Sequence, residues 1–380
     1  MKFPASLQAK LDLRQHNNAL RKLGDSNFLV DFSSNDYLGF AKSKSFFNQT
    51  HQFLVDHNLQ INGATGSRLL SGNHAVYNIA ETFIAQFHQV QAALIFNSGY
   101  DANVGFFSAV PQRNDVILFD SLAHASIRDG ILMSKAASYK FDHNDFEHLE
   151  SLIKKFKVAS NELYIVTESV FSMDGDAPNL NELVQVANRF NCKLVIDEAH
   201  ALGVFGDFGE GMVQHLNLQN DVFARIITFG KALGCHGAAI LGSNDLKKYL
   251  INFARSFIYT TGLSPHSVAT IYIGYQKLRS QPQKVAQLRN KIIFFNEQKH
   301  LMSLKQLFIY SKSAIQSALF PGNDNVKKIA EHLQDAGFDV KAILSPTVAE
   351  GQERLRICLH NYNSEKEIID VLKILSTFVF

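Results

Sequence analysis

The chain has 380 residues, of which 46% are hydrophobic and 19% are charged. This length suffices for two or three domains, and the hydrophobic share excludes an intrinsically disordered chain. The formal net charge of +2 excludes the strong basic field that nucleic-acid binding requires. No apolar run reaches the roughly 20 residues of a membrane span, and the first residues lack the apolar core of a signal peptide. We therefore expect a soluble, cytoplasmic protein with no membrane partner.

The charged share is below the roughly 25% typical of soluble domains, which favours a homo-oligomer that buries weakly charged surface. The chain has three cysteines, an odd number, at the widely separated positions Cys192, Cys235 and Cys358. This spacing argues against a disulfide framework and against a zinc site. We predict that all three are buried, reduced thiols.

The predicted elements begin with an amphipathic helix over residues 7–23 and a short strand over 28–32. Short apolar runs then recur, and each ends at small or polar residues, as buried parallel strands do. These runs cover residues 92–96, 116–119, 163–166, 193–196, 225–228 and 238–241. Helical patterns lie between several of them, for example over 74–87 and 180–190. The alternation predicts an α/β fold with a mostly parallel central sheet and helices on both faces.

The pattern changes after Pro265. Two long helical patterns extend to about residue 301, and shorter strand and helix patterns alternate from 315 to 378. We therefore predict a smaller α+β C-terminal domain. The expected division is an N-terminal arm over 1–40, a large catalytic domain over 41–265 and a small domain over 266–380.

Ligands of open α/β sheets bind at the carboxyl ends of the strands, so the residues directly after each predicted strand are candidate site residues. His124, Asp197, His200 and Lys231 are ionisable residues from four different strand ends. No dinucleotide fingerprint, P-loop or nucleophile elbow accompanies them. The pair Asp197 and His200 lacks a third ligand at a recognisable spacing, so we expect no metal.

Three of these strand ends suggest one cofactor. Lys231 lies among small residues, where burial would lower its pKa and suit it to Schiff-base chemistry, although a surface lysine is the alternative. The segment 97–100 precedes a helical pattern whose free N–H groups suit a phosphate, or it is a plain helix cap. Thr228 can add a hydroxyl there, and Asp197 can keep a ring nitrogen protonated. Together these features predict pyridoxal 5′-phosphate.

Five segments resemble those of the α-oxoamine synthases, a family of fold-type I pyridoxal-phosphate enzymes. They are DFSSNDYLG at 31–39, GATGSRLLSGN at 63–73, FSMDGD at 171–176, DEAH at 197–200 and TFGKALG at 228–234. The resemblance extends over nearly the whole chain. It implies a decarboxylative condensation of an amino acid with an acyl thioester.

The resemblance also implies roles for individual residues. Lys231 would carry the cofactor as a Schiff base and then act as the base at the amino-acid Cα. Asp197 would pair with the pyridine nitrogen, and His200 would hydrogen-bond the ring's phenolic oxygen. His124 would stack on the ring and contact substrate. Further cofactor contacts would come from Gly99, Tyr100, Ser172 and Thr228.

The same resemblance places part of the site at a dimer interface. The loop 259–265 would bring Thr260 or Thr261 to a neighbouring subunit's phosphate; Gly262 and Ser264 depart from the family pattern, so the choice between the two threonines stays open. Among the substrate contacts, Arg356 would hold the amino-acid carboxylate with Asn35 nearby. Arg21 and Thr347 would contact the acyl substrate.

Within the family, the segment 63–73 is most similar to the member of biotin biosynthesis that joins L-alanine to a pimeloyl thioester. Members that use serine or glycine are the nearer alternatives, and a non-catalytic protein of this fold is the more distant one. The sequence does not choose between coenzyme A and acyl-carrier protein as the acyl donor.

Overall fold

The computed structural model describes residues 3–24 and 28–379. The described chain divides into two compact units. The small unit comprises Met1–Ser34, Met173–Asp176 and Arg289–Phe380, and the large unit comprises Asn35–Ser172 and Ala177–Leu288. These limits differ from the expected 1–40, 41–265 and 266–380. The helix α11 (Pro265–Ser280) packs against α2 (Lys44–Asp56) and α3 (Ala75–Phe87), and so it belongs to the large unit.

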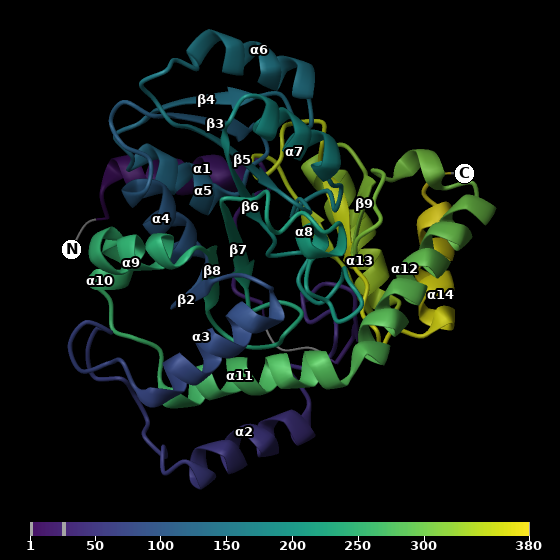
Figure 1. The fold of residues 1–380 in the computed structure, drawn as a ribbon. Helices are drawn as coiled ribbons and strands as arrows, with labels where there is room; N and C mark the ends of the chain where they lie inside the picture. The colour runs from purple at the N-terminus through teal and green to yellow at the C-terminus, as the bar shows by residue number, and fades with distance from the viewer. Residues whose placement is uncertain (1–2, 25–27, 380) are drawn as a thin grey trace. The chain divides into compact units, whose positions relative to one another are not determined.

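In the described residues, the large unit contains a seven-stranded sheet of order β2-β8-β7-β6-β5-β3-β4 (Figure 1). The strands are β2 (Ala92–Phe96), β3 (Val116–Asp120), β4 (Ala137–Phe141), β5 (Leu163–Glu168), β6 (Lys193–Asp197), β7 (Ala224–Thr228) and β8 (Ala238–Gly242). Strands β3 to β7 are mutually parallel, whereas β8 runs antiparallel to β2 and β7. The predicted α/β class and mostly parallel sheet are confirmed. The sequence did not reveal β4, because four of its five residues are exposed and carry no apolar pattern.

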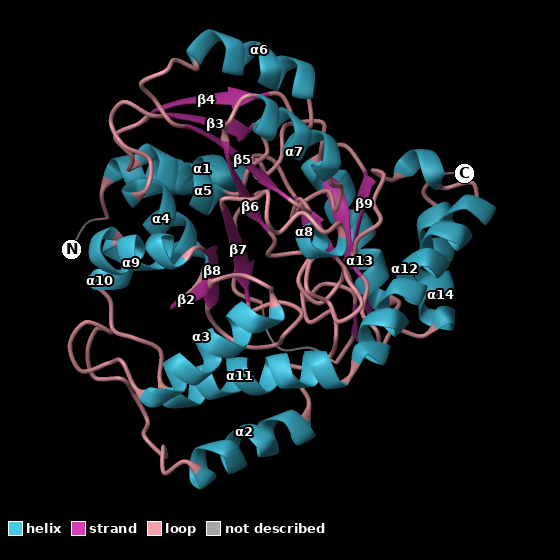
Figure 2. Ribbon diagram, viewed as in Figure 1, coloured by secondary structure: helices cyan, strands magenta, loops and turns pink. Residues whose placement is uncertain are grey.

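Helices cover both faces of this sheet, with α4, α9 and α10 on one side and α7 and α8 on the other (Figure 2). The remaining helices of the large unit are α4 (Gly99–Ala109), α5 (Ala125–Leu132), α6 (Phe146–Phe156), α7 (Leu180–Arg189), α8 (Met212–His215), α9 (Asn244–Phe253) and α10 (Arg255–Ile258), and α12 (Pro282–Leu301) begins there and ends in the small unit. Ser43, Asp145 and Asn179 start helices by accepting a hydrogen bond from the backbone N–H three residues later.

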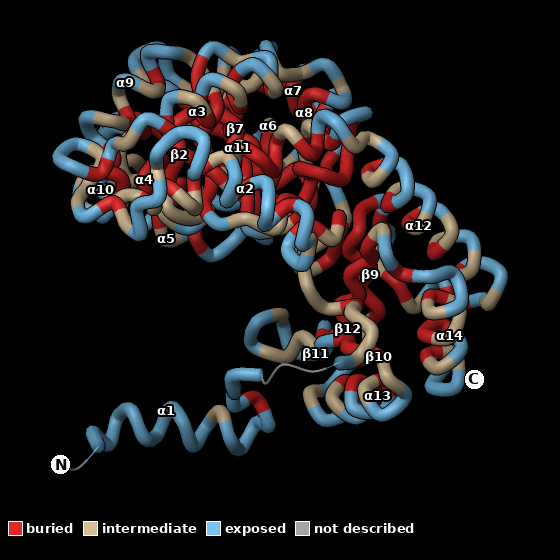
Figure 3. The backbone as a smooth tube through the Cα atoms, turned by 90° about the horizontal axis from the view of Figure 1, so that it is seen from below, coloured by how far each residue is buried: buried red, intermediate tan, exposed pale blue. Residues whose placement is uncertain are grey.

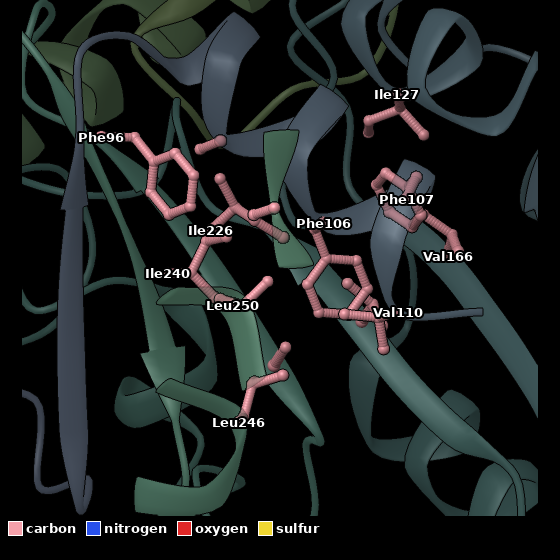
Figure 4. Close-up of a cluster of buried hydrophobic side chains, with 14 of the residues drawn as sticks. Phe96, Phe106, Phe107, Val110, Ile127, Val166, Ile226, Ile240, Leu246 and Leu250 are labelled. Carbon is pink, nitrogen blue, oxygen red and sulfur yellow. The ribbon is translucent and has the colours of Figure 1, made fainter. Parts of the chain in front are cut away.

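Buried apolar side chains join α4 and α9 to the sheet (Figure 4). Phe96, Phe106 and Leu250 are members of this cluster and are at most 2% exposed. The neighbouring helix α5 approaches α4 closely at Gly130, where an added Cβ would lie 2.9 Å from the backbone oxygen of Asn103. A glycine is therefore needed at this crossing, and the close approach sets two helices of the site side by side.

The small unit contains short strands and three helices of its own in the described residues. Its elements are α1 (Ala5–His16), β1 (Val30–Asp31), a 3₁₀ turn (Lys305–Leu307), β9 (Ile315–Leu319), α13 (Asn323–Asp335), β10 (Phe338–Asp339), β11 (Lys341–Ile343), β12 (Arg354–Cys358) and α14 (Glu365–Ser376). Strands β11, β12 and β9 form an antiparallel sheet, and β1 pairs with β10. Helix α1 is almost entirely exposed (Figure 3) and is shorter than expected, because Asn18 adopts a φ of 47°.

All three cysteines are free, and Cys358 is buried as predicted. Cys192 and Cys235 are partly exposed, so the expectation of burial is wrong for them. Of the helices that the structure describes, none is both long and apolar enough to cross a membrane.

A buried ion pair joins β7 to the segment that follows β6. The Arg225 guanidinium lies 2.6 Å from Glu198 Oε2, and the two side chains are 2% and 0% exposed. Arg225 also donates to the Glu210 carbonyl at 2.9 Å, and Glu198 accepts from the Val213 N–H at 2.9 Å. Each charge is thus paired and hydrogen-bonded, which is the condition under which buried ions are tolerated.

We predict that Arg225→Met destabilises the protein by about 3–5 kcal/mol, because it leaves the Glu198 carboxylate buried without its partner. The double variant Arg225→Met/Glu198→Gln should regain part of this loss, since glutamine is neutral and still accepts from Val213. Urea unfolding followed by far-UV circular dichroism measures both. Equal losses in the single and double variants would show that an unpaired charge is not the cause.

Candidate active site

The large unit gathers the predicted ionisable residues at one edge of its sheet. Glu168, Asp197 and Thr228 are the last residues of the adjacent parallel strands β5, β6 and β7. His200 and Lys231 follow three residues after the ends of β6 and β7. Because parallel strands bring their carboxyl ends to the same edge, these side chains share one site.

A first line of hydrogen bonds starts at Lys231. Its Nζ lies 2.7 Å from His200 Nε2, and His200 Nδ1 lies 2.8 Å from the Tyr37 hydroxyl. The Tyr37 hydroxyl donates in turn to Asn35 Oδ1 at 3.1 Å. His200 and Tyr37 are buried, whereas Lys231 is partly exposed. The ammonium group is therefore fixed in direction at a position that a bound molecule can reach.

A second line connects Asp197 with His124. The Asn103 amide donates to Asp197 Oδ2 at 2.9 Å and to Ser126 Oγ at 3.0 Å. Ser126 Oγ lies 2.8 Å from His124 Nδ1. The other oxygen of Asp197 accepts from the Ala199 N–H at 2.9 Å. Asp197 is 5% exposed, which makes it a buried carboxylate held by two N–H donors.

Glu168 is a second carboxyl group beside Asp197, opposite it in the β5–β6 register. It is 3% exposed, and its Oε1 accepts from the His124 backbone N–H at 2.8 Å. Burial and then the charge of Asp197 raise the pKa of Glu168 well above its ordinary value. His124 itself is exposed, although desolvation by the surrounding protein lowers its pKa. A bound molecule can therefore reach the imidazole.

The first turn of α4 meets the end of β7 at a point suited to a phosphate. The Ser98 side chain caps the helix by accepting from the Asp101 N–H. A Cβ added to Gly99 would lie 2.6 Å from Thr228 Oγ1, so a glycine is needed for this approach. The helix N-terminus and a hydroxyl thus face the same space, as phosphate sites require. Together with a lysine, a buried carboxylate and an open histidine ring, this donor set fits pyridoxal phosphate.

The loop that contains Thr260 and Thr261 is tied to the same edge. The Asn97 amide donates to Thr260 Oγ1 at 3.1 Å and to the Thr261 carbonyl at 2.7 Å. Tyr100, one residue into α4, is 51% exposed and donates to Asp129 at 2.8 Å. Ser172 lies after β5, where the chain passes from the large unit to the small one.

The small unit carries the other predicted substrate residues, and two of them meet. Arg21 donates to the Thr347 hydroxyl at 3.1 Å, which brings together the two side chains expected at the acyl substrate. Arg356 lies in β12 and is 9% exposed, with its guanidinium 3.0 Å from Cys358 Sγ. Arg354 forms an ion pair with Asp174.

Sequence reasoning missed four residues of the site: Tyr37, Asn103, Ser126 and Glu168. The sequence could have indicated Asn103, because this residue lies one helical turn after Gly99 and so shares a helix face with it. Glu168 follows two residues after the predicted strand 163–166 and was passed over in favour of Asp197. The contacts of Tyr37 and Ser126 depend on long-range packing that no local pattern shows.

The chain is similar to proteins of known family. A family model described as aminotransferase class I and II matches residues 28–372. This chain belongs to that family. An 8-amino-7-oxononanoate synthase of Emericella nidulans is 38% identical over 369 residues, which cover 92% of this chain and 89% of that protein.

Solved structures of similar fold extend this result. The crystal structure of an 8-amino-7-oxononanoate synthase from Francisella tularensis matches with a TM-score of 0.78 and 28% identity, covering 93% of this chain and 98% of that one. A serine palmitoyltransferase of Sphingomonas wittichii matches with a TM-score of 0.86 over 98% of this chain and 96% of that one, at 24% identity, which shows a shared fold. The resemblance predicted from the motifs is confirmed, as is the fold of the class I and II aminotransferases.

We predict that Glu168→Gln makes the stability of this family member less sensitive to rising pH. A raised carboxyl pKa stabilises the folded state below the ordinary value of 4.5, and this contribution is lost as the pH rises through the raised value. Glutamine keeps the acceptor for His124 but does not ionise. Thermal midpoints measured from acid to alkaline pH should therefore fall less in the variant; parallel curves would show that folding does not raise the pKa of Glu168.

Proposed function

We propose that this chain is a pyridoxal-phosphate enzyme that condenses L-alanine with a pimeloyl thioester to give 8-amino-7-oxononanoate in biotin biosynthesis. The acyl donor is a thioester of coenzyme A or of acyl-carrier protein. The observation that carries the proposal is the site at the sheet edge, where Lys231, His200 and Asp197 converge beside the Gly99–Thr228 approach. The relatives named above support the choice of alanine and the pimeloyl group.

The cofactor would be held by residues of the large unit. Lys231 would bind its aldehyde carbon, and Asp197 would keep its ring nitrogen protonated. The α4 N-terminus and Thr228 would hold the phosphate, and the imidazole of His124 would cover the ring. When bound, pyridoxal phosphate takes up the electron pair left at the alanine Cα.

The chain's own residues then move protons and orient the substrates. Arg356 binds the alanine carboxylate, because a guanidinium fits a carboxylate through two hydrogen bonds. Lys231 Nζ removes the Cα proton while His200 keeps the amine in place. The Cα electron pair attacks the thioester carbonyl, the C–S bond breaks, and the thiolate leaves and takes a proton from solvent. The carboxylate departs as CO₂, and Lys231 returns a proton to Cα.

We also propose a cytoplasmic homodimer with shared sites. The low charged fraction of the chain and the family resemblance of the 259–265 loop support it. In this arrangement Thr260 or Thr261 reaches the phosphate of the neighbouring subunit, and Asn97 sets the loop's direction.

We predict that Lys231→Ala abolishes the release of thiol from alanine and pimeloyl-coenzyme A, because the variant lacks the amine that removes the Cα proton. Far-UV circular dichroism should be unchanged. The matched control is Lys248→Ala, an exposed lysine on α9, which should keep full activity. The same assay with serine or glycine in place of alanine separates this function from the related condensations; turnover with serine alone would contradict the proposal.

A mixing experiment tests the shared site. Lys231→Ala chains and chains with Thr260→Val and Thr261→Val should each be inactive. If each site draws on two chains, unfolding and refolding them together creates dimers in which one site has every required residue. Part of the wild-type activity should then return. No return of activity, or an active monomer in sedimentation, would refute the shared site.

A further inference from the structure

Asn103 lies at the branch point of a buried line of hydrogen bonds. It comes from α4 and is 2% exposed, and Ser126 at the start of α5 is 1% exposed. One amide hydrogen is donated to Asp197 Oδ2 at 2.9 Å and the other to Ser126 Oγ at 3.0 Å. Both hydrogens of the amide are therefore committed, one on each branch.

The branch toward Ser126 fixes the direction of the next hydrogen bond. Ser126 Oγ accepts from Asn103, so its single hydrogen is available for His124 Nδ1, which lies 2.8 Å away. The Ser126 backbone N–H also donates to Nδ1, at 3.3 Å. A hydrogen on Nδ1 would oppose this N–H and would leave the Ser126 hydroxyl hydrogen without its acceptor. Nδ1 is thus an acceptor, and the proton of the neutral ring resides on Nε2.

The amide cannot reverse without losing the branch to Asp197. Turned over, its oxygen would face the Asp197 carboxylate, which offers no hydrogen to it. In the observed orientation, Asn103 Oδ1 is buried and has no hydrogen-bond partner in the described part of the chain. An unpaired buried acceptor is costly, and such costs are found where function requires the arrangement.

We infer that Asn103 is a positioning residue that holds His124 as the Nε2–H tautomer and at the same time holds the Asp197 carboxylate. The inference rests on the proposed function, in which His124 meets the acyl group. Among the described residues, no hydrogen-bond partner of His124 Nε2 is found, and the residue is exposed. His124 then acts as a hydrogen-bond donor to the thioester carbonyl oxygen and not as a base, which leaves proton removal to Lys231.

The two branches can be separated by two variants. Ser126→Ala removes the hydroxyl donor to His124 but keeps the contact of Asn103 with Asp197. Asn103→Leu has a similar shape and removes both. The full-length protein is labelled with ¹⁵N at histidine, and the two-bond ¹⁵N–¹H spectrum reports the tautomer. The signal that disappears in His124→Gln identifies the residue.

We expect the wild type to show His124 in the Nε2–H form alone, and both variants to show the Nδ1–H form as well. The dissociation constant of pyridoxal phosphate should rise on the order of tenfold in Asn103→Leu, the equivalent of one lost hydrogen bond, and stay unchanged in Ser126→Ala. An Nδ1–H form in the wild type, or an unchanged tautomer in Ser126→Ala, would overturn the inference. If Asn103→Leu does not fold, Ser126→Ala alone decides the tautomer.

The spectrum is readable with and without added cofactor. A wild-type protein that shows the Nε2–H form but does not condense alanine with a pimeloyl thioester would refute the proposed function and leave the role of Asn103 standing. An active wild type with an unchanged tautomer in Ser126→Ala would refute the role of Asn103 and leave the proposed function standing.

Discussion

The site depends on the alignment of three strand ends, and the Arg225–Glu198 ion pair holds two of them. Glu198 directly follows Asp197, and its backbone N–H donates to the Ile226 carbonyl at 2.7 Å, which continues the β6–β7 pairing past the end of β6. Arg225 in β7 then binds the Glu198 side chain. The two strands that carry Asp197 and Thr228 therefore cannot slide past each other. His200 and Lys231 keep their 2.7 Å contact because both of their loops begin from this fixed pair.

Several motif residues serve this scaffold and not the chemistry. In the DEAH segment, Asp197 and His200 face the site, whereas Glu198 is a buried ion-pair partner. In the 63–73 segment, Arg68 pairs with Glu81 at 2.6 Å and packs over the Tyr77 ring. A motif therefore contains both residues that stabilise the fold and residues that face the site. The structure is needed to tell these two kinds apart, because local spacing does not show which way a side chain points.

The sequence predicted the central sheet well because its strands are buried on both faces and form continuous apolar runs. Once the strands were predicted, the residues at their ends could be predicted as neighbours, because parallel strands place their carboxyl ends at the same edge of a sheet. It failed for β4, which is an exposed edge strand, and for the length of α1. It also failed for Asn103 and Ser126, whose meeting depends on the α4–α5 crossing at Gly130. Such a crossing follows from tertiary packing, and no periodicity reports it.

Two carboxyl groups at neighbouring strand ends would repel each other if both were ionised. The hydrogen bonds distinguish them. Asp197 accepts two hydrogen bonds, one from the Asn103 side-chain amide and one from the Ala199 backbone N–H. Glu168 accepts one, from the His124 backbone N–H, and is slightly more buried than Asp197. Burial beside Asp197 raises the pKa of Glu168 and so favours its protonated form. Of these two groups, Asp197 is then the carboxylate that can face a ring nitrogen. An amide at position 103 suits this arrangement, because an aspartate there would add a third acceptor and supply no hydrogen to either branch.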